Sequence, residues 1–234
     1  MPLHMRLGQN WLNDWLGFAV ESLCPLCQRS TVQVFCPDCE LQVWQCQVSS
    51  DTRLPEPTRA GKPLILAWGQ YQGSLKRAIA ALKYHNHPEI ARPLGEWLAQ
   101  TWQQSQQTAR FTVVPIPMHS SKQKTRGFNQ AELIARRFCD VTGLPLVAHG
   151  LERIQATQAQ FQAGSASNRL QNLAGAFQVG AVFQKKRPRY PVLLIDDIYT
   201  TGATIQSATI ALQKQGISVA GVAVVARPKL DRGG

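Results

Sequence analysis

Short, almost uninterrupted apolar runs alternate with segments of helical periodicity from residue 63 onward. The runs at 63–71, 111–117, 192–195 and 219–226 are rich in Val, Leu and Ile, which is typical of strands buried on both faces. Between these runs, apolar residues recur three and four positions apart, which predicts helices. Such alternation predicts an α/β fold whose parallel sheet is covered by helices on both faces.

Some of the predicted helices also carry end signals. Ser74 is expected to cap the first of them, Asn129 with Glu132 resembles a capping box, and Gly216 is expected to be a C-cap. The apolar faces that define the four helices consist of Leu75, Ala78, Ile79 and Leu82; of Ile90, Leu94, Trp97 and Leu98; of Ala131, Ile134, Ala135 and Phe138; and of Ile205, Ala208 and Leu212.

The pattern of apolar and polar residues is different before residue 64. An amphipathic helix is expected over residues 7–23, docked on the protein's own core, because its polar face lacks the Lys/Arg cluster of a membrane anchor. Residues 48–63 contain three prolines and little apolar content, which indicates a linker. We therefore predict an N-terminal module at 1–47 and an α/β domain at 64–230. Within that domain, the Gln-rich stretch 155–180 is long for a loop, which favours a functional or mobile one.

Composition narrows the class of protein. The 234 residues are 44% hydrophobic, which argues against wholesale disorder. No apolar run approaches the length of a membrane span, and the N-terminus lacks a secretory cleavage pattern, so we expect a cytoplasmic protein without membrane insertion. The 25 Lys and Arg exceed the 14 Asp and Glu, giving a formal charge of +11. This surplus indicates a polyanionic partner, such as nucleic acid or a phosphorylated metabolite, or else a basic surface kept for solubility.

Four cysteines have the spacing of a metal site. Cys24, Cys27, Cys36 and Cys39 form the pattern C-x2-C-x8-C-x2-C. Two such pairs can close a tetrahedral site for Zn²⁺, which would be structural because no coordination position stays open. Redox or disulfide roles are the alternative, and a reducing cytosol makes disulfides the poorer one. Cys46 has no assignable role, and Cys139 is expected to be a packing residue.

An acidic pair follows the apolar run at 192–195. In α/β sheets, ligands bind beyond the carboxyl ends of strands, where Asp196 and Asp197 are expected. Carboxylates suit a ribose diol or a Mg²⁺ ion, and the next turn offers helix-terminal amides to a phosphate. Mere helix capping is the alternative for the pair, and a P-loop NTPase is excluded because G-x-x-x-x-G-K-[ST] is absent. The turn consists of Thr200, Thr201, Gly202, Ala203 and Thr204.

This turn resembles the 5-phosphoribosyl 1-diphosphate (PRPP) loop of type I phosphoribosyltransferases. More closely, the chain from Cys24 to Pro228 resembles the ComF family of competence proteins. Besides the cysteine pairs and the acidic turn, the resemblance rests on the segment 114–130 and on shorter motifs. Its motif residues are Lys83, Tyr84, Gly127, Phe128, Asn129, Gln130, Thr157, Gln160, Arg169 and Asn172.

The resemblance implies a type I phosphoribosyltransferase fold and a role in natural transformation, with single-stranded DNA handled in the cytoplasm. The competence DNA-translocation machinery would then be a possible partner. By analogy, Asp196 and Asp197 would bind the ribose hydroxyls, residues 200–204 the 5′-phosphate, and the turn after 111–117 the pyrophosphate. The stretch 155–177 would be a mobile hood over the site. Lys122 departs from the pattern, because this family is expected to have Arg there.

The chemistry of PRPP leaves several alternatives open. Mg²⁺ and cations would have to meet the departing pyrophosphate, and Lys122, Lys124 and Arg126 suit that task unless they form a solvated surface loop. No acceptor site identifies itself, since Lys83, Tyr84 and His85 are equally a helix end. The protein is therefore a PRPP-binding protein that acts with single-stranded DNA, a phosphoribosyltransferase, or a PRPP-sensing regulator. The segment 185–189 is a candidate DNA contact or an ordinary solvated loop.

Overall fold

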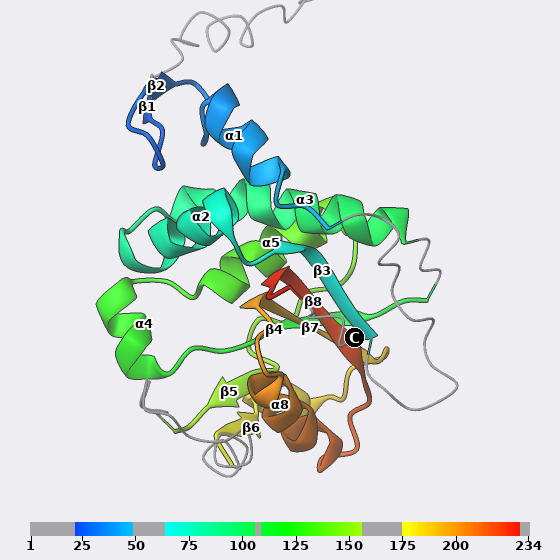
Figure 1. Ribbon diagram of the computed structural model, residues 1–234. Helices are drawn as coiled ribbons and strands as arrows, with labels where there is room; N and C mark the ends of the chain where they lie inside the picture. Colours follow the sequence, from blue (N-terminus) through cyan, green and yellow to red (C-terminus); the bar gives the residue numbers. More distant parts are fainter. Residues whose placement is uncertain (1–21, 49–63, 106–108, 156–174, 230–234) are drawn as a thin grey trace, which may run out of the picture.

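The computed structural model describes residues 22–48, 64–105, 109–155 and 175–229. Its centre is a four-stranded parallel sheet in the order β3-β8-β7-β4 (Figure 1). These strands are the four predicted apolar runs, and the central pair is buried on both faces. Their bounds are β3 (Leu64–Gln70), β4 (Thr112–Pro115), β7 (Val192–Ile198) and β8 (Val219–Arg227).

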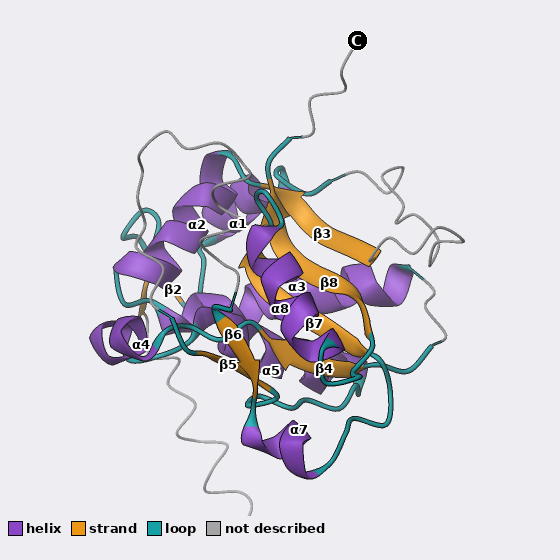
Figure 2. Cartoon of the chain, turned by 90° about the horizontal axis from the view of Figure 1, so that it is seen from below, coloured by secondary structure: helices purple, strands orange, loops and turns teal. Residues whose placement is uncertain are grey.

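Two layers cover the sheet (Figures 1 and 2). Leu193 and Ile195 of β7 pack in one hydrophobic cluster with three helices: α2 (Gly73–Tyr84), α3 (Ala91–Gln104) and α5 (Gln130–Thr142). A 3-10 turn, η1 (Pro88–Ile90), precedes α3. Val192 and Leu194 face the opposite cluster, as alternation along a strand requires. That second layer contains α7 (Ala181–Lys185), α8 (Ala203–Gln213) and a hairpin of β5 (Leu151–Arg153) and β6 (Phe177–Val179). The predicted α/β class and parallel sheet are confirmed.

The two predicted helix N-caps differ in outcome. The Asn129 side chain accepts a hydrogen bond from the Ala131 amide at 3.2 Å and caps α5 as expected. Glu132 instead pairs with Arg136 one turn later. The prediction for Ser74 is wrong, because Gln72 is the N-cap residue of α2. Ser74 lies inside the first turn, where its hydroxyl donates to the Gln42 side chain at 3.1 Å.

Other segments also depart from expectation. Residues 22–23, placed at the end of a predicted helix, form β1 (Ser22–Leu23), which pairs with β2 (Ser30–Thr31); the rest of that predicted helix lies outside the described residues. The segment after β4 forms a short helix, α4 (Ser120–Arg126), rather than a turn. Helix α8 ends at Gln213, and Gly216 with φ 69° belongs to the following turn.

The cysteine-rich module packs directly against the α/β domain. It contains α1 (Pro37–Trp44), whose last residue meets the ring of Trp68 at 5.7 Å and that of Trp97 at 5.4 Å between centroids. The chain then bonds to β3, since the Val48 amide donates to the Trp68 carbonyl at 3.0 Å. Aromatic pairs of this kind each add about 0.5–1.5 kcal/mol beyond the area they bury. The module and the domain therefore share one hydrophobic cluster.

Candidate functional site

The carboxyl edge of the sheet carries the acidic pair near the end of β7. Adjacent strand residues point to opposite faces, so Asp197 is directed toward the helical layer that contains Leu193 and Ile195, and Asp196 toward the other layer. Asp197 is 3% exposed and forms an ion pair with Lys83 at the end of α2. Asp196 is half-buried, and its Oδ1 accepts a 2.8 Å hydrogen bond from the Asp197 amide.

Burial and charge give these groups unusual pKa values. Burial opposes the charged form of Lys83, but Asp197 and Asp196 outweigh it, so the pKa of Lys83 lies above its ordinary value. Burial, and then the neighbouring Asp197, raise the pKa of Asp196 well above its usual range. Burial lowers the pKa of the Arg153 guanidinium on β5 below its ordinary value, although the nearby charge of Asp196 acts in the opposite direction. The edge therefore gathers two carboxyl groups and two cations from three elements.

The turn between β7 and α8 places polar groups beside this pair. Thr200 and Thr201 are exposed, and Thr204 is half-buried. Gly202 has φ 76°, a left-handed conformation that other residues rarely adopt, so this tight turn favours glycine. The first amides of α8 have no acceptor within their own helix. An anion could therefore bind to them within reach of the threonine hydroxyls.

The segment after β4 reaches the end of α2, which carries Lys83. Asn129 is buried, and its side-chain amide donates to the Ile116 carbonyl at 3.1 Å. Arg126 donates to the Gln130 side chain at 2.6 Å and lies over the Tyr84 ring at 5.4 Å. The ends of α2 and α4 therefore meet, which brings Tyr84 together with Arg126.

The remaining basic residues of α4 are placed differently. Lys122 and Lys124 are exposed on this short helix, which Figure 1 shows beyond the sheet. Among the described residues, no ion pair joins either lysine to an acidic group. The other motif residues of this segment, Gly127 and Phe128, form the left-handed C-cap of α4 and a contact with the core. Thr157, Gln160, Arg169 and Asn172 lie outside the described residues, as does most of the expected hood.

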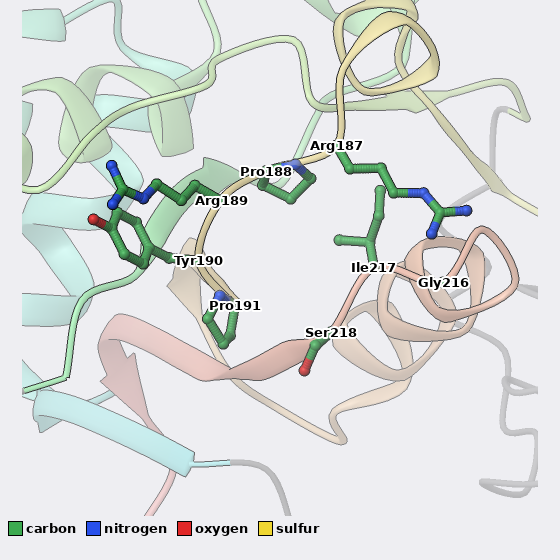
Figure 3. Close-up of a pocket in the computed structure, with 8 residues that line it drawn as sticks. All are labelled: Arg187, Pro188, Arg189, Tyr190, Pro191, Gly216, Ile217 and Ser218. Atoms are coloured by element: carbon green, nitrogen blue, oxygen red, sulfur yellow. The ribbon is translucent and has the colours of Figure 1, made fainter.

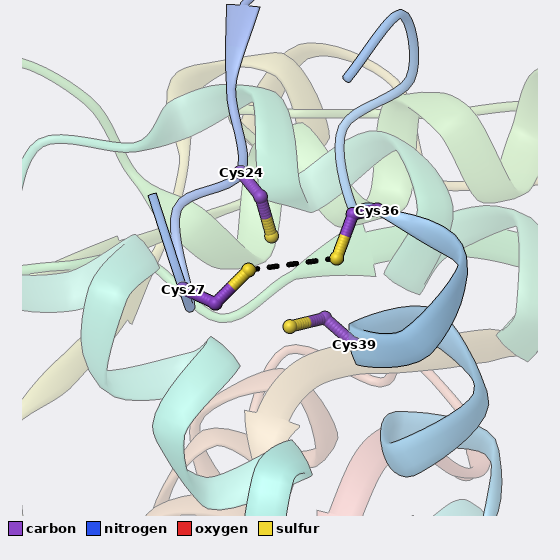
Figure 4. A group of neighbouring side chains, drawn as sticks. All are labelled: Cys24, Cys27, Cys36 and Cys39. Atoms are coloured by element: carbon purple, nitrogen blue, oxygen red, sulfur yellow. Dashed lines mark hydrogen bonds between the residues drawn. The ribbon is translucent and has the colours of Figure 1, made fainter. Parts of the chain in front are cut away.

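The four predicted metal ligands converge, as Figure 4 shows. The sulfur atoms of Cys24, Cys27, Cys36 and Cys39 all lie within 4.8 Å of one another, and those of Cys27 and Cys36 are 3.5 Å apart. A Zn–S bond of about 2.3 Å in a tetrahedron requires sulfurs about 3.8 Å apart. The residues therefore fit a structural Zn²⁺ ion, and they supply a complete set of four ligands.

Arg29 contributes the positive charge beside these sulfurs. Its guanidinium donates to Cys27 at 3.4 Å and Cys36 at 3.6 Å and pairs with Asp38 at 2.7 Å. Hydrogen bonding from Arg29 lowers the pKa of the Cys27 thiol to about 6, whereas burial raises the pKa of Cys39. Arg29 therefore favours the thiolate that a metal needs, and this cation is occupied by the site itself.

Two features of the acidic edge were not foreseen from the sequence. Lys83 was singled out, but not its ion pair with Asp197; a lysine 114 positions before an aspartate gives no local signal of contact. The role of Arg153 has no signal in the sequence, because this residue lies in a strand of three residues that the apolar pattern does not reveal. In the part of the chain that the structure describes, no helix is both long and apolar enough to cross a membrane.

Comparison with known proteins gives a consistent set of relatives. No family model matches the chain. The chain is 29% identical to Competence protein F of Haemophilus influenzae, covering 86% of this chain and 89% of the relative. It is 27% identical to Competence protein ComFC of Bacillus subtilis over 83% of this chain and 72% of the relative. It is also 25% identical to the DNA utilization protein YhgH of Salmonella typhi over 83% of this chain and 85% of the relative.

Proposed function

Because the chain belongs to the ComF family of competence proteins, we propose that it is a PRPP-binding protein with the type I phosphoribosyltransferase fold. It acts in natural transformation and handles incoming single-stranded DNA in the cytoplasm. The observation that carries the ligand assignment is the succession of acidic pair, tight turn and helix N-terminus at the carboxyl edge of the parallel sheet.

The two halves of this site suit the two halves of a ribose phosphate. Asp196 and Asp197 accept hydrogen bonds and would repel a phosphate, so they suit the neutral 2′- and 3′-hydroxyls. Residues 200–204 offer hydroxyls and helix-terminal amides, which suit the 5′-phosphate. The Lys83 ammonium compensates one of the two carboxylate charges. Asp196 lies near Arg153 and is half-buried, so it is the carboxylate that a cation could approach from solvent.

Mg²⁺ fits this donor set, because it prefers carboxylate oxygens and phosphate oxygens. Asp196 and Asp197 would hold it with the ligand, and the ion would neutralise charge on the pyrophosphate. Lys122, Lys124 and Arg126 are proposed to meet the pyrophosphate as well. Of these, Arg126 is supported by its contact with Tyr84, next to Lys83. Lys122 and Lys124 would have to reach the ligand from exposed positions on α4.

The part played by DNA is supported by the relatives and by charge. The relatives are named as competence and DNA utilization proteins. A formal charge of +11 favours salt-dependent contacts with a polyanion. The zinc module is proposed to be structural, since Arg29 is already engaged by the cysteines and by Asp38.

The test is a calorimetric titration of PRPP with Mg²⁺ into the zinc-loaded protein. We expect micromolar binding that Asp196→Asn/Asp197→Asn abolishes. The matched control is Glu89→Gln/Asp140→Asn, which removes the same charge from two exposed residues of η1 and α5. No binding by the parent protein, or equal loss in both variants, would refute the assignment. Release of pyrophosphate when a nucleobase or DNA is added would identify a transferase rather than a binding protein.

A further inference from the structure

A cavity of about 220 Å³ lies at the amino ends of β7 and β8, whereas the acidic pair lies at the carboxyl end of β7. It is formed by the segment 187–191, which leads into β7, and by the segment 216–218, which leads into β8 (Figure 3). Both strands are parallel and begin here, whereas Asp196 and Asp197 lie at the end of β7. The cavity is therefore separate from the proposed PRPP site.

Two arginines flank this cavity from opposite sides, as Figure 3 shows. Arg187 extends over the turn at Gly216, where a Cβ would lie 3.1 Å from its Nη1 atom. Arg189 lies over the ring of Tyr190, with 5.4 Å between guanidinium carbon and ring centroid. Both are exposed, and neither has a hydrogen bond or ion pair to any of the residues that the structure describes. These guanidinium groups are available to an anion.

The surrounding surface is also cationic. Lys185 and Lys186 at the end of α7 and Lys214 at the end of α8 are exposed. Between Ile154 and Leu230 the sequence contains eight Lys and Arg residues, but Asp196 and Asp197 are its only acids. No acidic residue of this stretch therefore neutralises the cations beside the cavity.

Between the two guanidinium groups, the cavity offers flat and apolar surfaces. Tyr190 and Pro188 are half-buried, and Pro191, the buried Ile217, Gly216 and Ser218 also line the cavity. Aromatic and apolar side chains next to cations are what single-stranded nucleic acid binds, because its bases are free to stack while its phosphates meet positive charge. Duplex DNA would present phosphates here, but its bases are already stacked on each other.

We propose that this cavity and its two arginines form a binding site for single-stranded DNA. The phosphates contact Arg187 and Arg189, and a base packs against Tyr190. The proposal rests on the proposed handling of single-stranded DNA and gives it a place, on the edge of the sheet that does not bind PRPP.

Fluorescence anisotropy with a labelled oligo-dT of about 15 nucleotides tests this placement. We expect Arg187→Ala/Arg189→Ala to weaken binding about tenfold or more and to lower the slope of log K against log salt by about 1.4, since each phosphate contact on a single strand contributes about 0.7. Tyr190→Ala should weaken binding about fivefold or more without changing that slope. The control Arg92→Ala/Arg136→Ala removes two exposed arginines from α3 and α5 and should bind almost like the parent.

Several outcomes would overturn the proposal. Equal losses in the two double variants would show that only net charge matters, and unchanged binding by Arg187→Ala/Arg189→Ala would place the DNA elsewhere. Equal affinity for a duplex would refute the base-stacking part. If the parent binds no oligo-dT, the role in handling DNA falls too. The PRPP titration, repeated on the same variants, separates these failures from failure of the PRPP site, and melting temperatures confirm that each variant is folded.

Discussion

Asp196 and Asp197 are neighbours in sequence, but they do not have the same surroundings. The ion pair of Asp197 with Lys83 is almost fully buried, with side-chain exposures of 4% and 17%. Asp196 faces the other layer, has more contact with solvent, and has a raised pKa. At this scale, Asp197 anchors the end of β7 to the end of α2, while Asp196 is the more accessible ligand.

Lys83→Met should destabilise the protein strongly. It removes the ammonium group and leaves the buried Asp197 carboxylate without its partner, which typically costs about 3–5 kcal/mol. Urea unfolding measures the loss. The double variant Lys83→Met/Asp197→Asn should recover most of it, because no charge is then left buried. Equal instability of the single and double variants would mean that the charge of Asp197 is not what the lysine compensates.

The raised pKa of Asp196 predicts a pH-dependent stability. A carboxyl group whose pKa is higher in the folded protein than in the unfolded chain stabilises the fold fully at pH values below its ordinary pKa, about 3.9. That stabilisation is lost as the pH rises through the higher folded value. Asp196→Asn should therefore gain free energy of unfolding relative to the parent between about pH 4 and the folded pKa. Urea titrations of both proteins across this range check it; a difference that does not vary with pH would contradict it.

Among the secondary-structure elements, the sequence predicted those that have a local or periodic signal. The strands β3, β4, β7 and β8 were identifiable because each is an apolar run. The Asn129 cap was identifiable because its partner lies two residues away. The cysteine site was identifiable from spacing. The predictions that failed concern contacts with distant partners. Ser74 bonds to Gln42 of another helix, and β5 and β6 are short strands that pair with each other although residues 154–176 separate them.

Asn129 joins two elements, and each of its hydrogen bonds can be tested separately. Asn129→Ala removes both the cap of α5 and the bond to Ile116, and should cost about 1–3 kcal/mol of unfolding free energy. Asn129→Ser keeps an acceptor for the Ala131 amide and adds no charge, but it loses the donor to Ile116, so its cost should be smaller. Thermal unfolding compares the two. A loss in the Ser variant as large as in the Ala variant would assign the stabilisation to the bond with Ile116.

For the whole molecule, the cysteine module is part of the main hydrophobic cluster rather than an appendage. Phe35, between the two cysteine pairs, stacks on Trp97 at 6.1 Å, and Trp44 contacts Trp68 and Trp97. The boundary predicted at 48–63 remains a prediction about sequence. Aromatic contacts join residues on both sides of this segment. Composition carries no information on such contacts, so it did not predict how closely the module packs on the α/β domain.

Removal of the metal should therefore also destabilise the α/β domain. Cys36→Ser should lose the one Zn²⁺ expected per chain by elemental analysis. It should also change tryptophan fluorescence, because Trp44 belongs to the module and Trp97 packs against it. Its melting temperature should fall, as the metal contributes folding free energy. Cys139→Ser, which alters a buried cysteine outside the four-cysteine site, should retain the metal. Retention of zinc by Cys36→Ser would contradict the four-cysteine site.

The length of β7 sets the distance between the two edges of the sheet. Seven residues from Val192 to Ile198, at about 3.3 Å per residue, separate them by about 20 Å. Ionic screening at physiological salt extends only about 8 Å. A sugar phosphate at one edge and a nucleic acid at the other are therefore electrostatically independent, and each anion should bind equally well whether or not the other is present.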